Sequence, residues 1–185
     1  MRLIRSFPAT IPAGRSYVVD DAERHVNTNY SYRGLVVYGD DLVHLDWDMA
    51  VSREDLERFA RLAARTPDRV LVAPQRVDVG DGRRGLTKPV WNMRVNVGGR
   101  LRHVTETDRT CDLYGFGMVY LPGKLLAGFE DDYRQALDAG TVRYDDTGFA
   151  GWATREQGPA TIDWTVRPVH LHYKISEVAA SWARS

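Results

Sequence analysis

The segment Leu42-Val-His-Leu-Asp-Trp-Asp-Met49 combines an apolar run with two acidic residues directly after it. A short apolar run bounded by polar residues is typical of a buried strand. On an extended chain, residues two apart point to the same face, so Asp46 and Asp48 are expected to reach one ligand at the carboxyl end of this strand. Open α/β sheets bind their ligands at that end.

The residues that follow predict a helix and then a second strand. Ser52 is suited to cap a helix, with Asp55 three residues later, and apolar residues recur at helical spacing until Thr66-Pro67. Residues 69–73 form another short apolar run. Residues 42–73 therefore predict a β-α-β unit of the kind that builds a parallel sheet.

Weaker patterns predict further elements on both sides of this unit. The expected strands are Arg2–Phe7, Ser16–Val19, Leu35–Tyr38, Val90–Val97, Leu101–Val104 and Ala160–Tyr173. The expected helices run from Pro122 to near Gly128, over Glu130–Ala139, and along the tail from Ser176. Since neither a repeat nor a linker divides the chain, we predict a single α/β domain with two halves, 1–75 and 76–175, and a tail, 176–185.

Composition narrows the class of protein. The chain has 185 residues, 43% of them hydrophobic, which suits one cored domain. Its 25 basic and 25 acidic residues cancel, so no overall field attracts nucleic acid or an anionic membrane. Cys111 is the only cysteine, which excludes an internal disulfide and a cysteine-built zinc site. The sequence shows neither a signal peptide nor an apolar stretch of spanning length, so we expect a cytoplasmic protein without a membrane segment.

The acidic pair suggests a metal site. A hard cation such as Mg²⁺ or Mn²⁺ takes oxygen ligands and bridges one or two carboxylates to substrate phosphates, which makes Asp46 and Asp48 candidate ligands. The alternative is a solvated turn, which is what most Asp-x-Asp pairs form. His170 and His172 alternate on a predicted strand, and either one could add an imidazole nitrogen. His44 lies deeper in its strand, where we expect a packed structural histidine.

The order of these motifs resembles a known family. The run Tyr38-Gly-Asp-Asp-Leu-Val-His-Leu-Asp-Trp-Asp-Met49 is similar to the strand that delivers the metal-binding D-x-D motif in family-two and related GT-A glycosyltransferases. Tyr17-Val-Val-Asp-Asp21 resembles the second strand of that family, whose acidic end contacts the nucleoside. Trp47 stands where a ring could stack on a sugar or base.

Two later segments continue the resemblance. Tyr114-Gly-Phe-Gly117 resembles the glycine-containing segment that precedes the acceptor side of the family's site. Gly128-Phe-Glu-Asp131 resembles the G-G-F-D-E turn, with Ala127 in place of the first glycine.

The last two motifs concern proton transfer and the metal. Tyr144-Asp-Asp146 resembles the x-E-D motif, whose final acidic residue is the catalytic base of inverting members. Here Asp145 replaces the glutamate and Asp146 occupies the base position. Pro168-Val-His-Leu-His-Tyr173 resembles the C-terminal histidine segment that completes the coordination of the metal.

Together the resemblance implies a Rossmann-like mixed sheet flanked by helices. It also implies transfer of a sugar from a nucleoside diphosphate sugar, with a UDP-sugar favoured, to a hydroxyl acceptor, with inversion and with Mn²⁺ or Mg²⁺. The implied site residues are Asp146 as base; Asp20, Asp21, Asp46, Trp47, Gly115 and Gly117 for the donor; and Asp46, Asp48, His170 and His172 for the metal. The acceptor stays open between a small molecule and a hydroxylated DNA base, among others.

Two other functions remain open. Only 45 residues precede Asp46 and no first helix is evident among them, so a non-catalytic nucleotide- or sugar-binding module of the same fold is an alternative. A metal-dependent nucleotidyltransferase also uses paired carboxylates, although we find no glycine-rich phosphate loop near the start of the chain.

Arginines supply a possible basic rim for a phosphate-bearing acceptor or for DNA. The alternative is that they are solvated surface charges, which the neutral total favours. These residues are Arg83, Arg84, Arg94, Arg100 and Arg102.

Overall fold

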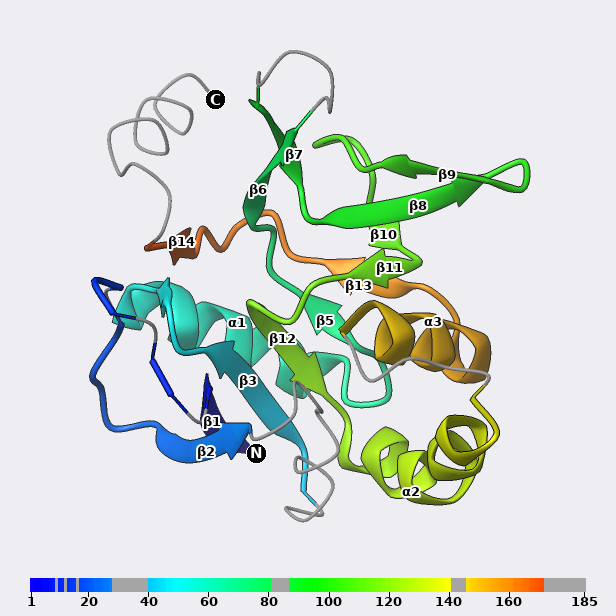
Figure 1. The fold of residues 1–185 in the computed structure, drawn as a ribbon, viewed down its shortest axis with the longest axis horizontal. Coiled ribbons are helices and arrows are strands. Elements are labelled where there is room, and N and C mark those ends of the chain that lie inside the picture. The colour runs from blue at the N-terminus through cyan, green and yellow to red at the C-terminus, as the bar shows by residue number, and fades with distance from the viewer. Residues whose placement is uncertain are drawn as a thin grey trace.

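A seven-stranded mixed sheet forms the centre of the molecule in the computed structural model, which describes residues 1–8, 10–11, 13–15, 17–27, 40–80, 87–140 and 146–171 (Figure 1). The strand order is β10-β13-β5-β12-β3-β1-β2. These strands are β10 (Thr110–Cys111), β13 (Ala160–Ile162), β5 (Leu71–Val72), β12 (Met118–Leu121), β3 (Leu42–Asp46), β1 (Arg2–Pro8) and β2 (Glu23–Asn27).

Most strands of this sheet run in one direction. β1 is parallel to β2 and β3, and β13 is parallel to β5. β12 is antiparallel to both of its neighbours, β3 and β5. The carboxyl ends of β1, β3, β5 and β13 therefore lie at one edge of the sheet together with the amino end of β12. We call this edge the carboxyl edge.

The predicted β-α-β unit is partly correct. β3 and β5 do run in the same direction, but they are not neighbours because β12 lies between them. We did not predict β12, although all four of its residues are buried. A strand that is covered on both faces shows no polar alternation, which makes it hard to identify in the sequence.

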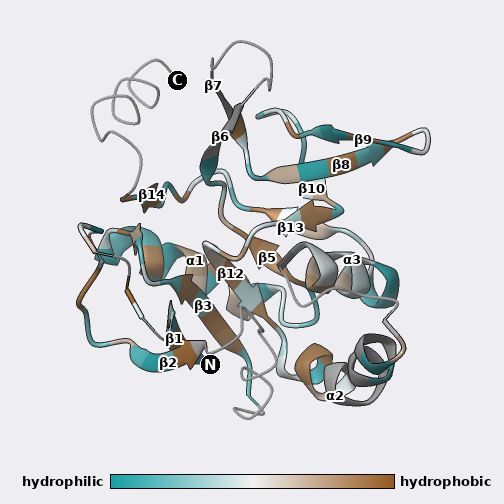
Figure 2. Ribbon diagram, in the orientation of Figure 1, coloured by the Kyte–Doolittle hydropathy of each residue, from teal (hydrophilic) through white to brown (hydrophobic). Residues whose placement is uncertain are grey.

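Helices cover both faces of the sheet. Helix α1 (Arg53–Arg65) packs on one face, and α2 (Gly123–Asp138) and α3 (Asp146–Gln157) pack on the other. The α1 face includes Val43, Leu45, Phe59, Ala63, Leu71, Met118 and Tyr120. The opposite face includes Ile4, Leu42, Val119, Leu121, Leu125, Leu126, Phe149 and Trp152. Figure 2 shows hydrophobic colours along β3 and β5 at the centre and hydrophilic colours over much of the outlying β9.

The prediction for α1 is confirmed at both ends. The backbone N–H of Asp55 donates to the Ser52 hydroxyl over 3.0 Å, so Ser52 caps the helix. The C-cap is Thr66, whose N–H donates to the Ala63 carbonyl. The local sequence is sufficient to define this element.

The helix predictions after residue 120 are wrong in detail. A single helix, α2, continues through Gly128 where we expected two helices, and α3 was not expected. The predicted strand Ala160–Tyr173 is also wrong in its described part, up to residue 171, because the chain leaves β13 at Asp163, turns, and forms only the short β14 (Val169–His170) there.

Near the amino end, the described residues 17–19 are not in a strand, and the strand instead follows at β2. The predicted strand Val90–Val97 is divided at Asn92 between β7 (Thr87–Trp91) and β8 (Met93–Val97). The predicted strand Leu35–Tyr38, the pair Arg83-Arg84 and the tail from Ser176 lie outside the described residues.

Three small sheets surround the carboxyl edge. β6 (Arg76–Gly80) pairs with β7, and β4 (Met49–Ala50) pairs with β14. β11 (Leu113–Tyr114), β8 and β9 (Arg100–His103) form a three-stranded sheet. Gly98 and Gly99 have φ of 58° and 83° and form the turn of the β8–β9 hairpin, where a side chain would be strained. This hairpin projects away from the main sheet (Figure 1).

In the part of the chain that the structure describes, no helix combines the length and the apolar character needed to cross a membrane.

Candidate functional site

The two acidic residues after β3 have different surroundings. Asp46 is the last residue of β3, and Trp47-Asp48 form the turn into β4. The extended geometry that we expected through Asp48 is therefore wrong, because the chain turns directly after Asp46. The Asp48 side chain is 7% exposed and that of Asp46 is 30% exposed.

One of the two candidate histidines lies beside Asp48. Nε2 of His170 is 3.3 Å from Oδ2 of Asp48. The pairing of β14 with β4 holds the two residues together, and the N–H of Leu171 donates to the Asp48 carbonyl over 2.8 Å. The structure thus joins two predicted ligands that are far apart in the sequence, whereas His172 lies outside the described residues.

Arg5 connects two segments of the site from the protein interior. It is 1% exposed, and its guanidinium donates to both carboxylate oxygens of Asp20, the shortest distance being 2.6 Å. The same guanidinium donates to the backbone carbonyls of Asp46 and Met49 over 2.6 and 2.9 Å. Arg5 therefore fixes Asp20 and the Asp-x-Asp turn relative to each other. We did not identify it from the sequence, where the only signal is an arginine inside an apolar strand.

The segment around Asp20 is linked to the turn a second time, because the N–H of Val18 donates to the Trp47 carbonyl over 2.9 Å. Burial on its own would raise the pKa of Asp20, but the hydrogen bonds and the charge of Arg5 outweigh burial and hold this pKa below its usual range. Asp20 is thus an ionised counter-charge for Arg5. Asp21 is exposed, and Trp47 is half-buried.

Gly115 and Gly117 lie next to this turn. The N–H of Asp46 donates to the Gly117 carbonyl over 2.9 Å. A methyl group on Gly115 would be 2.6 Å from Nε2 of Gln75, and one on Gly117 would overlap Oε1 of the same side chain. The two glycines therefore allow Gln75 to lie against their backbone.

Two buried acceptor oxygens lie at the carboxyl edge, and neither was identified from the sequence. Oε1 of Gln75, shortly after β5, has no hydrogen-bond partner among the described residues. Oδ2 of Asp163, directly after β13, also has none there, whereas its Oδ1 accepts from Thr165. Buried oxygens without a partner are costly, so these two suit the hydroxyl groups of a ligand.

His44 is the packed histidine that we predicted. It is fully buried, and burial lowers its pKa to about 3, so the ring is neutral. Nδ1 donates to the Phe116 carbonyl, and Nε2 accepts from the Ser6 hydroxyl, each over 2.8 Å. Its 3.9 Å contact with Asp46 is consequently not an ion pair.

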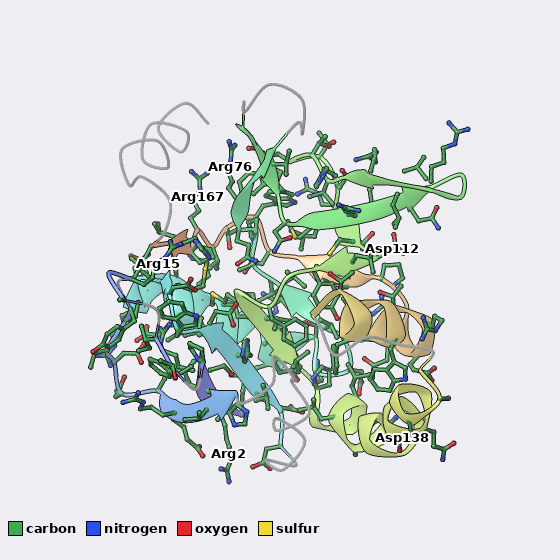
Figure 3. The ribbon with its side chains drawn as sticks, viewed as in Figure 1. Arg2, Arg15, Arg76, Asp112, Asp138 and Arg167 are labelled. Carbon is green, nitrogen blue, oxygen red and sulfur yellow. The ribbon has the colours of Figure 1, made fainter. Side chains whose placement is uncertain are left out.

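Arginines lie on the same side of the molecule as the carboxyl edge. Figure 3 shows Arg15, Arg76 and Arg167 on the side where β14 lies, and Arg2 at the opposite end of β1. The Arg76 guanidinium stacks 4.4 Å from the ring centre of Trp91. These positive charges would favour a phosphate-bearing ligand.

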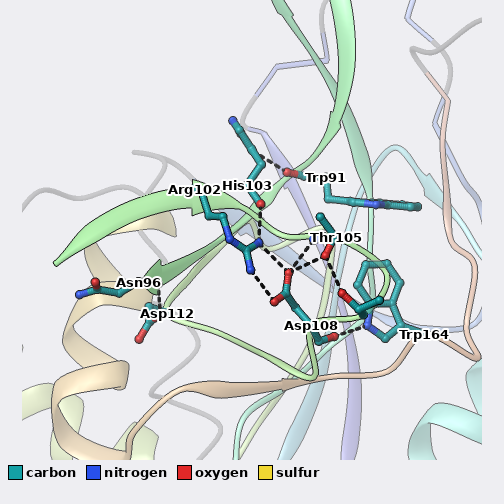
Figure 4. A network of polar contacts seen from close by, with 9 residues as sticks. Trp91, Asn96, Arg102, His103, Thr105, Asp108, Asp112 and Trp164 are labelled. Atoms are coloured by element: carbon teal, nitrogen blue, oxygen red, sulfur yellow. Dashed lines mark hydrogen bonds and ion pairs between the residues drawn. The ribbon is translucent and has the colours of Figure 1, made fainter. Parts of the chain in front are cut away.

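The basic rim that we considered from the sequence is only partly available. Arg102 makes two hydrogen bonds of 2.8 Å to the Asp108 carboxylate, which also accepts from Thr105 (Figure 4). These bonds, that of Arg102 foremost, hold the pKa of Asp108 well below its usual range. Arg94 and Arg100 are exposed on the hairpin.

No protein-family model matches this chain. A search of curated proteins gives no match either. Among solved structures, the crystal structure of A197 from STIV is similar, with a TM-score of 0.55 over 92% of this chain and 85% of that chain. The two sequences are 14% identical, so this likeness concerns the fold alone and supports the mixed α/β architecture.

The residue types at the carboxyl edge, carboxylate and imidazole, are ones that bind divalent cations. In residues 40–80, 87–140 and the other described ranges, no three histidine, cysteine or acidic side chains gather at one point. Asp48 and His170 nevertheless offer a carboxylate oxygen and an imidazole nitrogen 3.3 Å apart, with Asp46 two residues away. Mg²⁺ and Mn²⁺ accept such a partial set when phosphate and water supply the other ligands.

Proposed function

We propose that this chain is a GT-A-type glycosyltransferase that moves a sugar from a nucleoside diphosphate sugar, with a UDP-sugar favoured, to a hydroxyl acceptor. The observation that carries the proposal is the contact between Asp48 and His170 at the carboxyl edge of a mixed sheet. Open α/β sheets bind ligands at this edge. The sequence resemblance had nominated both residues independently.

Asp48 and His170 would hold Mn²⁺ or Mg²⁺, with phosphate and water as the other ligands. When bound there, such a cation would offset the negative charge of the departing diphosphate. Asp146, the first residue of α3, is our candidate base. It would take the proton from the acceptor hydroxyl as that oxygen bonds to the anomeric carbon and the bond from this carbon to the diphosphate breaks, with inversion.

Other residues at the edge suit the donor. Asp20, held by Arg5, and the exposed Asp21 lie in the segment joined to the Trp47 turn, where the nucleoside would bind. Oε1 of Gln75 and Oδ2 of Asp163, which have no partner among the described residues, would accept hydrogen bonds from sugar hydroxyls.

The test is a thermal-shift titration with UDP, GDP and their sugar derivatives in Mn²⁺, in Mg²⁺ and in a chelator, because a ligand that binds only the native state raises its melting temperature. We expect a metal-dependent shift with one nucleotide family. Asp48→Asn should weaken that binding by about tenfold or more, since a ligating carboxylate is lost. Asp138→Asn, an exposed substitution at the end of α2, is the matched control and should bind like the wild type.

Equal binding by Asp48→Asn and the wild type in Mn²⁺ would remove this residue from the site. Slow hydrolysis of the bound sugar nucleotide without an acceptor would support transfer. Binding without hydrolysis or transfer would favour the non-catalytic module. Release of pyrophosphate from a nucleoside triphosphate would identify a nucleotidyltransferase instead.

A further inference from the structure

A cavity of about 240 Å³ lies between the β11-β8-β9 sheet and the first turn of α3. Pockets for drug-sized ligands measure ~300–1,000 Å³, so this one suits a single substituted ring. Its lining residues are Asn92, Met93, Arg94, His103, Leu113, Tyr114 and Thr147. We call it the hairpin pocket.

The hairpin pocket carries positive charge on one wall. Arg94 of β8 lies directly opposite His103 of β9 and Leu113 of β11, so these three side chains share one face of the small sheet. Nδ1 of His103 is 3.0 Å from the Trp91 carbonyl and donates to it, which fixes the ring (Figure 4). The exposed Arg94 guanidinium adds donors suited to phosphate or carboxylate.

Tyr114 lines the hairpin pocket and carries a buried hydroxyl that has no partner among the described residues. The residue is 3% exposed. Burial raises the pKa of Tyr114 well above its usual range, so the hydroxyl keeps its proton and can donate. An unsatisfied buried hydroxyl is unfavourable, and a ligand oxygen in the pocket would satisfy it.

The hairpin pocket is next to the proposed site. Asn92 donates its N–H to the Gln75 carbonyl and accepts from the N–H of Gly115. The three residues from Gly115 to Gly117 span at most ~11 Å, and the Gly117 carbonyl accepts from Asp46. On its other side the pocket is lined by Thr147, which follows Asp146. The amino end of α3 contributes a partial positive charge there.

We propose that the hairpin pocket binds an anionic, ring-sized molecule through Arg94 and the Tyr114 hydroxyl, and that this molecule is the sugar acceptor, an anionic monosaccharide. Its role as acceptor rests on the proposed function, whereas binding in the pocket does not. The phosphate and carboxylate forms of the ligand share the same recognition chemistry.

Calorimetric titrations with glucose 6-phosphate, glucuronate, glucose and inorganic phosphate test the proposal in metal-free buffer without nucleotide. We expect both anionic sugars to bind at least about tenfold more tightly than glucose, because a charge-assisted hydrogen bond is worth roughly that factor. They should also bind more tightly than phosphate, which lacks the ring. Equal binding of glucose would overturn the charge requirement, and equal binding of phosphate would reveal a simple anion site.

Two variants locate the binding. Arg94→Gln should weaken the binding of glucuronate by about tenfold. Arg100 is an exposed arginine on the same hairpin outside the pocket, and Arg100→Gln should change this affinity less than about twofold. Equal effects of the two substitutions would refute the assignment. Tyr114→Phe should weaken binding and leave the urea midpoint of the free protein unchanged or higher, since it removes an unsatisfied group. Unchanged affinity for glucuronate would show that the Tyr114 hydroxyl does not contact the ligand.

Asp48→Asn separates this proposal from the proposed function. It should abolish metal-dependent nucleotide binding while leaving glucuronate binding in metal-free buffer intact. If no nucleotide binds but glucuronate does, the transferase proposal fails and the pocket stands. If nucleotide binds but neither anionic sugar does, the pocket proposal fails and the transferase proposal stands.

Discussion

Replacing Arg5 by methionine tests how much the hydrogen bonds of its buried guanidinium stabilise the protein. Methionine preserves the apolar stem but removes every hydrogen bond to Asp20, Asp46 and Met49. An acceptor left unsatisfied in the interior costs ~1–3 kcal/mol, and two backbone carbonyls lose their guanidinium donor. Asp20 is 29% exposed, so water can solvate its carboxylate, and losing this bond adds little to the loss of stability. We expect the free energy of unfolding to fall by about 3 kcal/mol, chiefly because the two carbonyls lose their donor.

Urea denaturation at pH 7 measures this loss, with Asp20→Asn as the comparison. Asp20→Asn leaves both carbonyl bonds in place but removes the counter-charge of the buried Arg5 guanidinium, so it should also lower the free energy of unfolding. Arg5→Lys keeps the charge but not the planar fork and should be intermediate. A loss below about 1 kcal/mol for Arg5→Met would refute the reasoning.

The same variant has a pH signature. Arg5 lowers the pKa of Asp20 in the folded protein, so this stabilisation is fully present above the unfolded value of about 4 and is lost as pH falls through the folded pKa. The difference in stability between the wild type and Arg5→Met should therefore narrow below pH 4. A constant difference down to pH 3 would show that the Asp20 charge contributes little.

Three further outcomes are expected from the structure. Ser52→Ala should lower the free energy of unfolding by about 1 kcal/mol in urea, because α1 loses its cap; no change would contradict the cap. Because the neutral His44 resists protonation until about pH 3, the wild type should lose up to ~1.4 kcal/mol per pH unit as pH falls below 6.5, and His44→Gln should show a flatter profile by thermal melting. Gly117→Ala should reduce the melting temperature through its collision with Gln75, and adding Gln75→Ala should restore part of it; an additive loss would exclude the collision.

The elements that the sequence predicted correctly depend on local patterns. β3, α1 and the Ser52 cap are defined within a few residues of the chain, so periodicity and capping were enough to locate them. The packed position of His44 also followed from its depth in a strand. Such features need no knowledge of distant segments.

The features that the sequence analysis missed depend on distant contacts. Arg5 reaches residues 15 and more than 40 positions away, and Gln75 lies against Gly115 and Gly117 from the segment between β5 and β6. The local sequence around these side chains does not show which distant groups they contact. Spacing alone suggested Asp48 and His170 as separate candidate ligands, but it could not show that they meet, because it says nothing about the pairing of β4 with β14.

The position of β12 has a consequence for how the chain is made. Leu42 pairs with Leu121, about 80 residues later, so the centre of the sheet cannot close until most of the polypeptide has left the ribosome. Until then β3 and β5 each have an open edge, and open edges pair readily with other chains. Fragments that stop before Met118 should accumulate as aggregates. A separately made 76–185 fragment should rescue the 1–75 fragment only by inserting β12 between β3 and β5.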